Sequence, residues 1–151
     1  MTAFVDEIRP PEVELGDDEE RLLRQITVDH WNEQQRIPSS MAFGPASIDN
    51  LMASHTRESV VSAQESRDWF NENLPKKSYG VWAFTVRHAI DQGLRSVDDS
   101  DTPLAPGQLR PPGHCYVDYR HLTKSERRAT RSALLRIALE LGEIPTVGEL
   151  G

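Results

Sequence analysis

The stretch Pro111-Pro112-Gly113-His114-Cys115-Tyr116-Val117-Asp118-Tyr119-Arg120 predicts a short β-strand with two chemically different faces. Successive side chains on a strand point to opposite sides, so Cys115, Val117 and Tyr119 share an apolar face that should pack on a core. The other face carries an imidazole, a phenol, a carboxylate and a guanidinium, from His114, Tyr116, Asp118 and Arg120. This polar row fits an active site, a docking surface, or a structural ladder of hydrogen bonds and ion pairs.

Around this strand the sequence predicts an α+β fold, with a small sheet packed against about three helices. Apolar runs predict strands near residues 79–86, 94–97 and 114–120, with 79–86 at the centre of the sheet. Helices are predicted at 18–33, 62–74 and 123–141, and capping boxes at 62–65 and 123–126 support the last two. Residues 46–56 fit either a helical turn or an irregular segment. The core is expected to contain Trp82, Phe84, Val117, Leu134 and Ile137.

The chain has 151 residues, enough for one domain with its own core, which we assign to residues 17–151. Residues 1–16 are acidic and hold few large apolar groups, so they are predicted to be a mobile arm. The first 20 residues contain eight acidic groups and one arginine, which account for the entire net charge of -7. A neutral body with an acidic arm does not exclude nucleic acid as a partner.

The single cysteine, Cys115, rules out an intramolecular disulfide and favours the reducing cytoplasm. No apolar run approaches the length of a membrane span, and the acidic N-terminus is unlike a signal peptide. We therefore expect a cytoplasmic protein without a membrane partner.

If the polar row is catalytic, the candidate catalytic residues are His114, Asp118 and Arg120. His114 and Asp118 lie roughly 13 Å apart along a strand at about 3.3 Å per residue, so they could address opposite ends of an extended substrate. Asp118 and Arg120 are close enough to pair. A paired carboxyl has a lowered pKa, which suits a structural ion pair better than a general base.

A second interpretation adds Asp98 or Asp99, at the end of one predicted strand, to Asp118-Tyr119-Arg120 on the next. This resembles the layout of restriction-type nucleases, in which such carboxylates and a lysine hold magnesium and activate water. Arg120 stands at the lysine position; it cannot deprotonate but can contact a phosphate. The five histidines and Cys115 show no zinc-site spacing, and no cofactor-binding motif occurs, so neither a metal nor a cofactor is expected.

The predicted C-terminal helix carries a basic stripe, formed at helical spacing by Lys124, Arg127, Arg128 and Arg131. Cations in the first turns oppose the helix dipole, so we expect an anionic group against them. The candidates are the acidic arm, an acidic protein partner and a nucleic-acid phosphate, and a solvated face is the alternative. No aromatic residues interleave with the stripe, so single-stranded nucleic acid is not indicated.

Several short motifs follow one another along residues 36–118: Ser39-Ser40-Met41-Ala42-Phe43, Met52-Ala53-Ser54, Gly80-Val81, Gly93-Leu94, Asp98-Asp99 and Pro112-Gly113-His114. Their order resembles a layout seen in a group of small uncharacterised bacterial proteins. In that group Ser-Ser-x-x-Phe precedes Leu-Ser-Val, and Pro-x-His follows near the end; here Met52-Ala53-Ser54 replaces Leu-Ser-Val. The resemblance implies a bacterial source but no activity and no site residue.

These observations lead to two hypotheses about function. The first is a small bacterial accessory or regulatory protein that binds a larger protein partner through the polar row and the basic stripe. The second is a small hydrolase or nuclease-like enzyme that acts on an anionic, phosphodiester substrate through His114, Asp118 and Arg120. A pocket that gathers these side chains would favour the enzyme, and a flat surface would favour binding.

Overall fold

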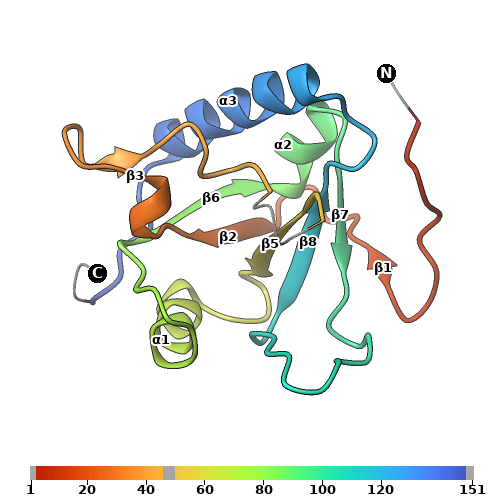
Figure 1. Cartoon of the computed structure of the whole chain (residues 1–151), viewed down its shortest axis with the longest axis horizontal. Coiled ribbons are helices and arrows are strands. Elements are labelled where there is room, and N and C mark those ends of the chain that lie inside the picture. Colours follow the sequence, from red (N-terminus) through yellow and green to blue (C-terminus); the bar gives the residue numbers. More distant parts are fainter. Residues whose placement is uncertain (1–2, 46–49, 149–151) are drawn as a thin grey trace.

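The computed structural model describes residues 3–45 and 50–148. Its main sheet is built from six antiparallel strands: β1 (Val13–Glu14), β2 (Arg21–Gln25), β5 (Met52–Arg57), β6 (Val81–Thr85), β7 (Arg95–Asp98) and β8 (His114–Asp118). They lie in the order β1-β7-β8-β5-β2-β6 (Figure 1). After a 3₁₀-helix at Val28–His30, the short strands β3 (Trp31–Asn32) and β4 (Ile37–Pro38) form a separate sheet.

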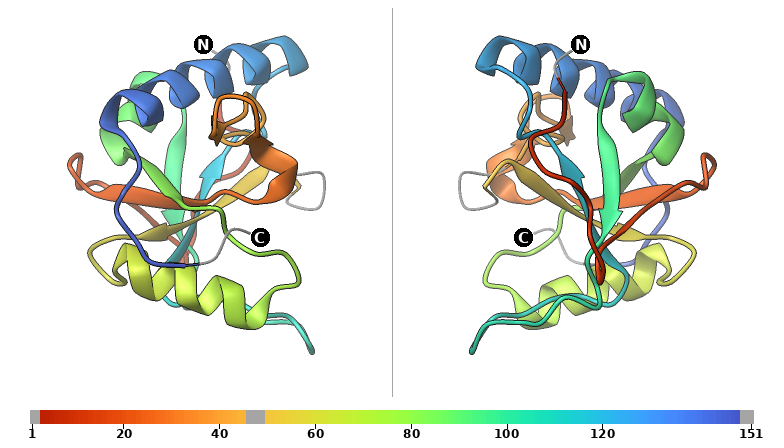
Figure 2. Two further views of the ribbon diagram at one scale, coloured as in Figure 1. Left: turned by 90° about the vertical axis from the view of Figure 1, so that its left-hand side faces the viewer. Right: turned by 90° about the vertical axis from the view of Figure 1, so that its right-hand side faces the viewer.

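The described residues form three α-helices, α1 (Ala63–Asn73), α2 (Val86–Asp91) and α3 (Lys124–Leu141). α2 and α3 cover one face of the sheet and α1 covers the other, which gives three layers (Figures 1 and 2). The α+β fold is confirmed, as are the strands predicted near 79–86, 94–97 and 114–120 and the helices predicted at 62–74 and 123–141. Among the described helices, none combines the length and the apolar character needed to cross a lipid bilayer.

Both predicted capping boxes are present. Ser62 Oγ accepts a hydrogen bond from the Glu65 main-chain nitrogen at 3.1 Å, and Thr123 Oγ1 accepts one from that of Glu126 at 3.1 Å. The two glutamates accept in return from the main-chain nitrogens of Ser62 and Thr123. These reciprocal bonds satisfy donors that a helix leaves unpaired at its start, so they set where α1 and α3 begin.

The predicted helix at 18–33 is wrong, because this segment contains β2, the 3₁₀-helix and β3. Leu22 and Leu23 are 0% and 2% exposed, yet they belong to different apolar clusters on opposite sides of the sheet. β2 lies between β5 and β6 and is covered on both faces, so its apolar residues are consecutive rather than alternating. Pairing with two neighbouring strands therefore outweighs the helical spacing of Leu22, Leu23 and Ile26.

The strand predicted as central, β6, is the last strand of the sheet. Ile144 covers its outer edge and donates from its main-chain nitrogen to Val81 O at 2.9 Å. β5 lies near the middle instead, between β8 and β2. It occupies part of the segment 46–56 that the sequence left undecided, of which residues 46–49 lie outside the described residues.

The main core lies on the side of the sheet that α3 covers. It contains Trp82, Phe84, Val117 and Leu134, each at most 4% exposed, with Ile137 packed against it, so the predicted core is confirmed. The same cluster includes the predicted packing face of this strand, namely Cys115 and Val117 of β8 and Tyr119 directly after it. His114 alternates with these residues along the strand and therefore lies on the α1 side of the sheet.

Residues 3–15 run along the β7 edge of the sheet (Figure 1). Val13 and Glu14 pair with Asp98 and Val97, and Leu15, which is 8% exposed, donates from its main-chain nitrogen to Ser96 O at 2.8 Å. Further toward the N-terminus, the Arg95 guanidinium lies over the Phe4 ring, 4.3 Å from its centroid. Whether residues 1–16 move independently of the domain stays a prediction, and residues 1 and 2 lie outside the described residues.

Candidate functional site

His114, the first residue of β8, makes hydrogen bonds with both of its ring nitrogens. Its Nδ1 lies 2.6 Å from Asp99 Oδ1, and its Nε2 lies 3.2 Å from Ser54 Oγ. An ionised carboxylate can only accept, so this arrangement favours the tautomer with the proton on Nδ1. Nε2 is then the acceptor for the Ser54 hydroxyl. The three side chains form a polar series, which we call the Asp99–His114–Ser54 series.

Strand pairing brings these residues together from distant parts of the sequence. β5 and β8 are antiparallel, with Thr56 opposite His114 and Ser54 opposite Tyr116, so Ser54, Thr56 and His114 share one face of the sheet. Asp99 follows the last residue of β7, on the other side of β8. The Arg24 guanidinium holds the main chain at Ser54, because its Nη1 donates to Ser54 O at 2.6 Å. Three neighbouring strands therefore fix the Asp99–His114–Ser54 series.

Ser54 and His114 of the series line a groove of about 650 Å³ between α1 and the sheet. Ser54, Thr56 and His114 contribute to its floor, and Trp69 and Phe70 of α1 contribute to one wall. On the opposite side the loop that precedes β8 reaches alongside α1 and supplies Gln108, Leu109 and Pro111 (Figure 2). The volume of the groove falls within the range of small-molecule sites, roughly 300–1,000 Å³. We refer to this space as the α1 groove.

A second, more polar groove of about 310 Å³ adjoins the first. Ser54, His114, Gln108 and Leu109 line both spaces. The second groove is otherwise bordered by Glu12, Asn50, Met52, Asp99, Arg110 and Tyr116. Ser54 and His114 therefore lie where the two grooves meet, which is a position from which they can reach a bound molecule.

A line of hydrogen-bonded polar side chains runs under the α1 groove. Ser78 Oγ donates to Gln25 Oε1 at 2.7 Å, Gln25 Nε2 donates to Ser66 Oγ at 3.1 Å, and Ser66 Oγ lies 2.8 Å from Thr56 Oγ1. Ser78, Ser66 and Thr56 are all buried. These bonds hold the Thr56 hydroxyl beside His114 and two residues from Ser54.

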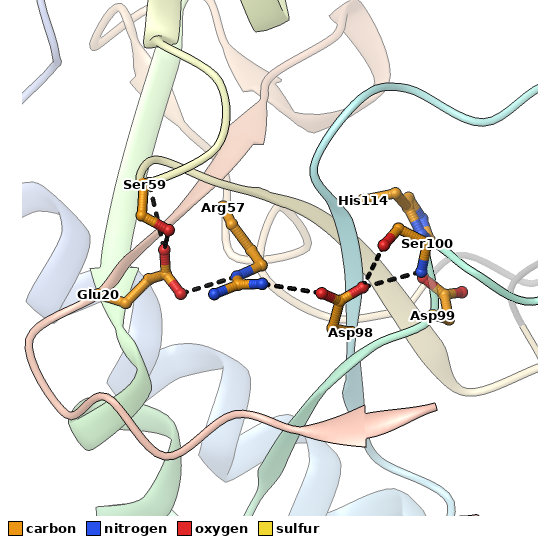
Figure 3. Close-up of polar contacts among 7 residues, drawn as sticks. All are labelled: Glu20, Arg57, Ser59, Asp98, Asp99, Ser100 and His114. Atoms are coloured by element: carbon orange, nitrogen blue, oxygen red, sulfur yellow. Dashed lines mark hydrogen bonds and ion pairs between the residues drawn. The ribbon is translucent and has the colours of Figure 1, made fainter. Parts of the chain in front are cut away.

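Behind Asp99, on the other face of the sheet, a row of ion pairs fixes the end of β7 (Figure 3). Arg57 Nε donates to Glu20 Oε1 at 2.8 Å and Arg57 Nη1 donates to Asp98 Oδ2 at 2.8 Å, while Ser59 donates to the other Glu20 oxygen. Ser100 donates to Asp98 Oδ1 from its main-chain nitrogen and its hydroxyl. Burial alone would raise the pKa of Asp98, but the Ser100 hydrogen bonds and the Arg57 charge outweigh it and lower that pKa.

The structure separates the other two predicted catalytic residues from His114. Asp118 is fully buried and accepts from Arg95 Nε at 3.0 Å and from Arg120 Nε at 2.9 Å, and Arg120 also donates to Asp6 Oδ2 at 2.8 Å. Burial would raise the pKa of Asp118, but the hydrogen bonds and charge of Arg120 outweigh it and lower that pKa. Among the described residues that line either groove, His114 is the one member of the predicted set His114, Asp118 and Arg120.

The residues of the predicted nuclease-like layout do not come together in the structure either. Asp98 is opposite Cys115 and Arg95 is opposite Asp118, so the two carboxylates lie at opposite ends of the same strand pair. Within residues 3–45 and 50–148, no group of three or more His, Cys, Asp or Glu side chains is arranged to hold a metal ion. Cys115 is fully buried, and burial raises the pKa of its thiol, so it serves as a core residue.

The basic stripe lies on the side of the sheet opposite the α1 groove. Lys124 and Arg128 are exposed, whereas Arg127 is half-buried and donates to Leu122 O at 2.8 Å. Arg131 is half-buried and packs close to Gly44. In the part of the chain that the structure describes, none of the four forms an ion pair with a carboxylate.

Comparison of the chain with protein-family models, with curated proteins and with solved structures finds no match. The sequence pattern points to His114 and Asp99 but not to Ser54 and Thr56, because only the pairing of β5 with β8 brings these two hydroxyls to His114. A hydroxyl, an imidazole and a carboxylate bonded in series are suited to nucleophilic or general-base catalysis.

Proposed function

We propose that this protein is a small hydrolase that cleaves an ester or a related acyl bond with Ser54, His114 and Asp99. The observation that supports this function is the Asp99–His114–Ser54 series at the junction of two grooves. Serine hydrolases of unrelated folds use the same three residue types, with the carboxylate on Nδ1 and the hydroxyl on Nε2.

In the proposed reaction, Ser54 Oγ attacks the carbonyl carbon of the substrate while its proton passes to His114 Nε2. The bond from the carbonyl carbon to the leaving alcohol then breaks, and the alcohol takes that proton. A water molecule next attacks the acyl group on Ser54, giving a proton to His114 Nε2. The carboxylic acid departs and the proton returns to Ser54 Oγ. Asp99 stays ionised and stabilises the charged imidazole.

Negative charge on the substrate oxygen requires hydrogen-bond donors. We assign this role to the Thr56 hydroxyl, on the same face of β5 as Ser54, and to the side-chain amide of Gln108, which lines both grooves. Gln108 Oε1 accepts from the Ala105 main-chain nitrogen at 3.0 Å, which orients the amide so that its Nε2 can donate. Asn50 supplies another amide at the rim of the second groove.

A phosphodiester hydrolase acting through Asp118 and Arg120 has less support, because ion pairs engage both side chains away from the grooves. We place the proposed enzyme in the bacterial cytoplasm. The bacterial source rests on the resemblance carried by the order of short motifs from Ser39 to His114, and the compartment rests on the free, buried thiol of Cys115.

Reaction with a fluorophosphonate probe tests the proposed function, because such probes phosphonylate serines that a histidine activates. Peptide mapping should find the probe on Ser54, and Ser54→Ala and His114→Gln should abolish the adduct. Ser132→Ala, a change at an exposed serine of α3, is the matched control and should label as the wild type does. Labelling that persists in Ser54→Ala, or a folded wild type that takes up no probe, would exclude this mechanism.

A second candidate function is that of an accessory protein that binds an acidic protein partner through α3. It is supported by the exposed cations Lys124 and Arg128, which have no carboxylate partner among the described residues. Binding of a glutamate-rich peptide should weaken in the Lys124→Gln/Arg128→Gln variant and fade as salt rises. Arg136→Gln, at an exposed arginine of the same helix, serves as the control. Equal binding by both variants would remove this candidate.

A further inference from the structure

We infer that the α1 groove receives an uncharged, apolar acyl group of the substrate and disfavours an anionic one. This inference rests on the proposed hydrolase function for its chemistry and specifies the substrate class. Its structural basis is the lining of the groove, which combines an apolar wall, charged groups already engaged by the protein, and Ser54 and His114 of the Asp99–His114–Ser54 series.

The apolar wall comes from two segments that face each other across the groove. In α1 the fully buried positions are Ala63, Ser66 and Arg67, so the large rings of Trp69 and Phe70 are left half-exposed at the groove instead of in the core. On the other side, Leu109 is 56% exposed. Exposed apolar groups gathered around a concave space mark a ligand site more than a structural feature.

The charged groups around the groove are already bonded within the protein. Lys76 and Asp29, both at the lining, form an exposed ion pair, so their two charges largely cancel there. Arg24, also at the lining, directs its guanidinium to the carbonyl oxygens of Ala42, Gly44 and Ser54. A phosphate or carboxylate would have to compete with these partners, whereas an uncharged chain would not.

The position of Ser54 sets the direction in which the substrate lies. Ser54 and His114 line the α1 groove together with Trp69 and Leu109, so a carbonyl carbon placed at Ser54 can extend its acyl chain between these apolar side chains. The leaving alcohol would then lie toward the second groove, which Ser54 and His114 also line. The two grooves therefore correspond to the two halves of an ester.

A series of p-nitrophenyl esters tests this substrate class, because all share one leaving group. We expect kcat/KM to rise by ~10-fold or more from acetate to hexanoate, since each methylene in an apolar pocket contributes. The adipate half-ester, which has the hexanoate chain length with a terminal carboxylate, should be a poorer substrate than hexanoate. Trp69→Ala should remove most of the hexanoate advantage, measured as the ratio of kcat/KM for hexanoate to kcat/KM for acetate. Trp69→Phe should retain the advantage.

Binding of an uncharged anilinonaphthalene dye and of its sulfonate provides a measurement that does not depend on catalysis. The uncharged dye should bind more tightly than the sulfonate and should lose affinity in Trp69→Ala. It should bind Leu141→Ala, changed at an exposed leucine on the opposite side of the sheet, as it binds wild type. Circular dichroism checks that each variant is folded.

The outcomes separate the inference from the function on which it rests. Two results would overturn the inference but not the proposed hydrolase function. One is Ser54-dependent ester hydrolysis with no preference for hexanoate, and the other is such hydrolysis with a preference for the adipate half-ester. Absence of both hydrolysis and Ser54 labelling overturns the proposed function, and dye binding then decides whether the groove selects uncharged apolar groups. Equal binding of both dyes, or binding unaffected by Trp69→Ala, overturns that selection.

Discussion

Asp98 and Asp99 are consecutive in the chain, yet their carboxylates bond to groups on opposite faces of the sheet. Asp98 pairs with Arg57 on the main-core side, and Asp99 binds His114 Nδ1 on the α1 side. The first aspartate thus fixes the end of β7, and the second orients the imidazole. The turn that contains Asp98 and Asp99 therefore both stabilises the fold and positions a residue of the candidate site.

The two aspartates should give opposite results when each is changed to asparagine. Asp99→Asn should slow fluorophosphonate labelling of Ser54 by ~10-fold or more, because loss of the carboxylate from such a series impairs the histidine by up to ~10⁴-fold in known enzymes. Its melting temperature should stay within a few degrees of wild type. Asp98→Asn should lower the melting temperature and affect labelling less. Identical labelling by wild type and Asp99→Asn would show that Asp99 has no part in activating Ser54.

Arg57→Met should destabilise the protein by about 3 kcal/mol, because it leaves the Glu20 carboxylate buried without its ion-pair partner. The Glu20 side chain is 2% exposed and that of Arg57 is 23% exposed. Combining Arg57→Met with Glu20→Gln should recover part of the loss, since a neutral amide then replaces the buried Glu20 carboxylate, although Asp98 still lacks its Arg57 partner. Urea unfolding measures both effects. A loss below about 1 kcal/mol for the single change would contradict this assignment, because that is the range of an exposed ion pair.

His55 should make the protein less stable in mild acid. Burial, together with the nearby Arg24 and His114, holds the pKa of His55 well below its usual value of 6.5. Below about pH 6.5 the His55 imidazole binds a proton in the unfolded chain but not in the folded protein, so the free energy of unfolding falls as pH falls. Above about pH 6.5 the imidazole is neutral in both states, so His55 adds no pH dependence there. Between pH 6.5 and 5, wild type should lose up to about 1.4 kcal/mol more per pH unit than His55→Leu. Parallel stability curves for the two proteins would refute this role.

Leu134→Ala should destabilise the protein by about 2 to 5 kcal/mol, because Leu134 is 0% exposed in the main core and its removal leaves a cavity. Leu141→Ala on the same helix is the control. Because Leu141 is 53% exposed, this change should lower the free energy of unfolding by less than about 0.5 kcal/mol. Comparable losses for both variants would mean that α3 packs on the sheet with a different face.

Removing residues 1–15 should lower the melting temperature by more than a few degrees. The truncation exposes the β7 edge and the site of Leu15, whose burial contributes roughly 1.5 to 3 kcal/mol. Leu15→Ala in the full-length chain separates the packing of this residue from the loss of strand pairing. An unchanged melting temperature in the truncated protein would show that the segment is a dispensable arm.

The fold was predictable where the local signals agreed with the final packing. Capping boxes at Ser62 and Thr123 located α1 and α3, and the alternation of β8 placed Cys115 in the core and His114 on the other face. β2 was not predictable from its local pattern, because Leu22 and Leu23 are buried in two different clusters. Only the pairing of β2 with β5 and β6 explains why consecutive leucines suit a strand there.

Only part of the candidate site was predictable, because a sequence pattern shows what lies along one strand but not which strands are neighbours. His114 was selected because it starts a strand with a polar face, and Asp118 and Arg120 were placed with it because they share that face. A pattern along one strand cannot show that Arg95, from β7, engages Asp118, or that Ser54, from β5, lies at His114. Those contacts depend on the strand order β7-β8-β5, which brings together residues 23 and 60 positions apart.

Trapping of the acyl intermediate shows whether Ser54 is the nucleophile that His114 activates. The protein is mixed with p-nitrophenyl hexanoate, quenched in acid during the first turnover, before deacylation is complete, and examined by intact mass and peptide mapping. We expect a hexanoyl group on Ser54 in wild type, a smaller amount in Asp99→Asn and none in His114→Gln. An acyl group on another residue, or hydrolysis that proceeds equally well in Ser54→Ala, would contradict it.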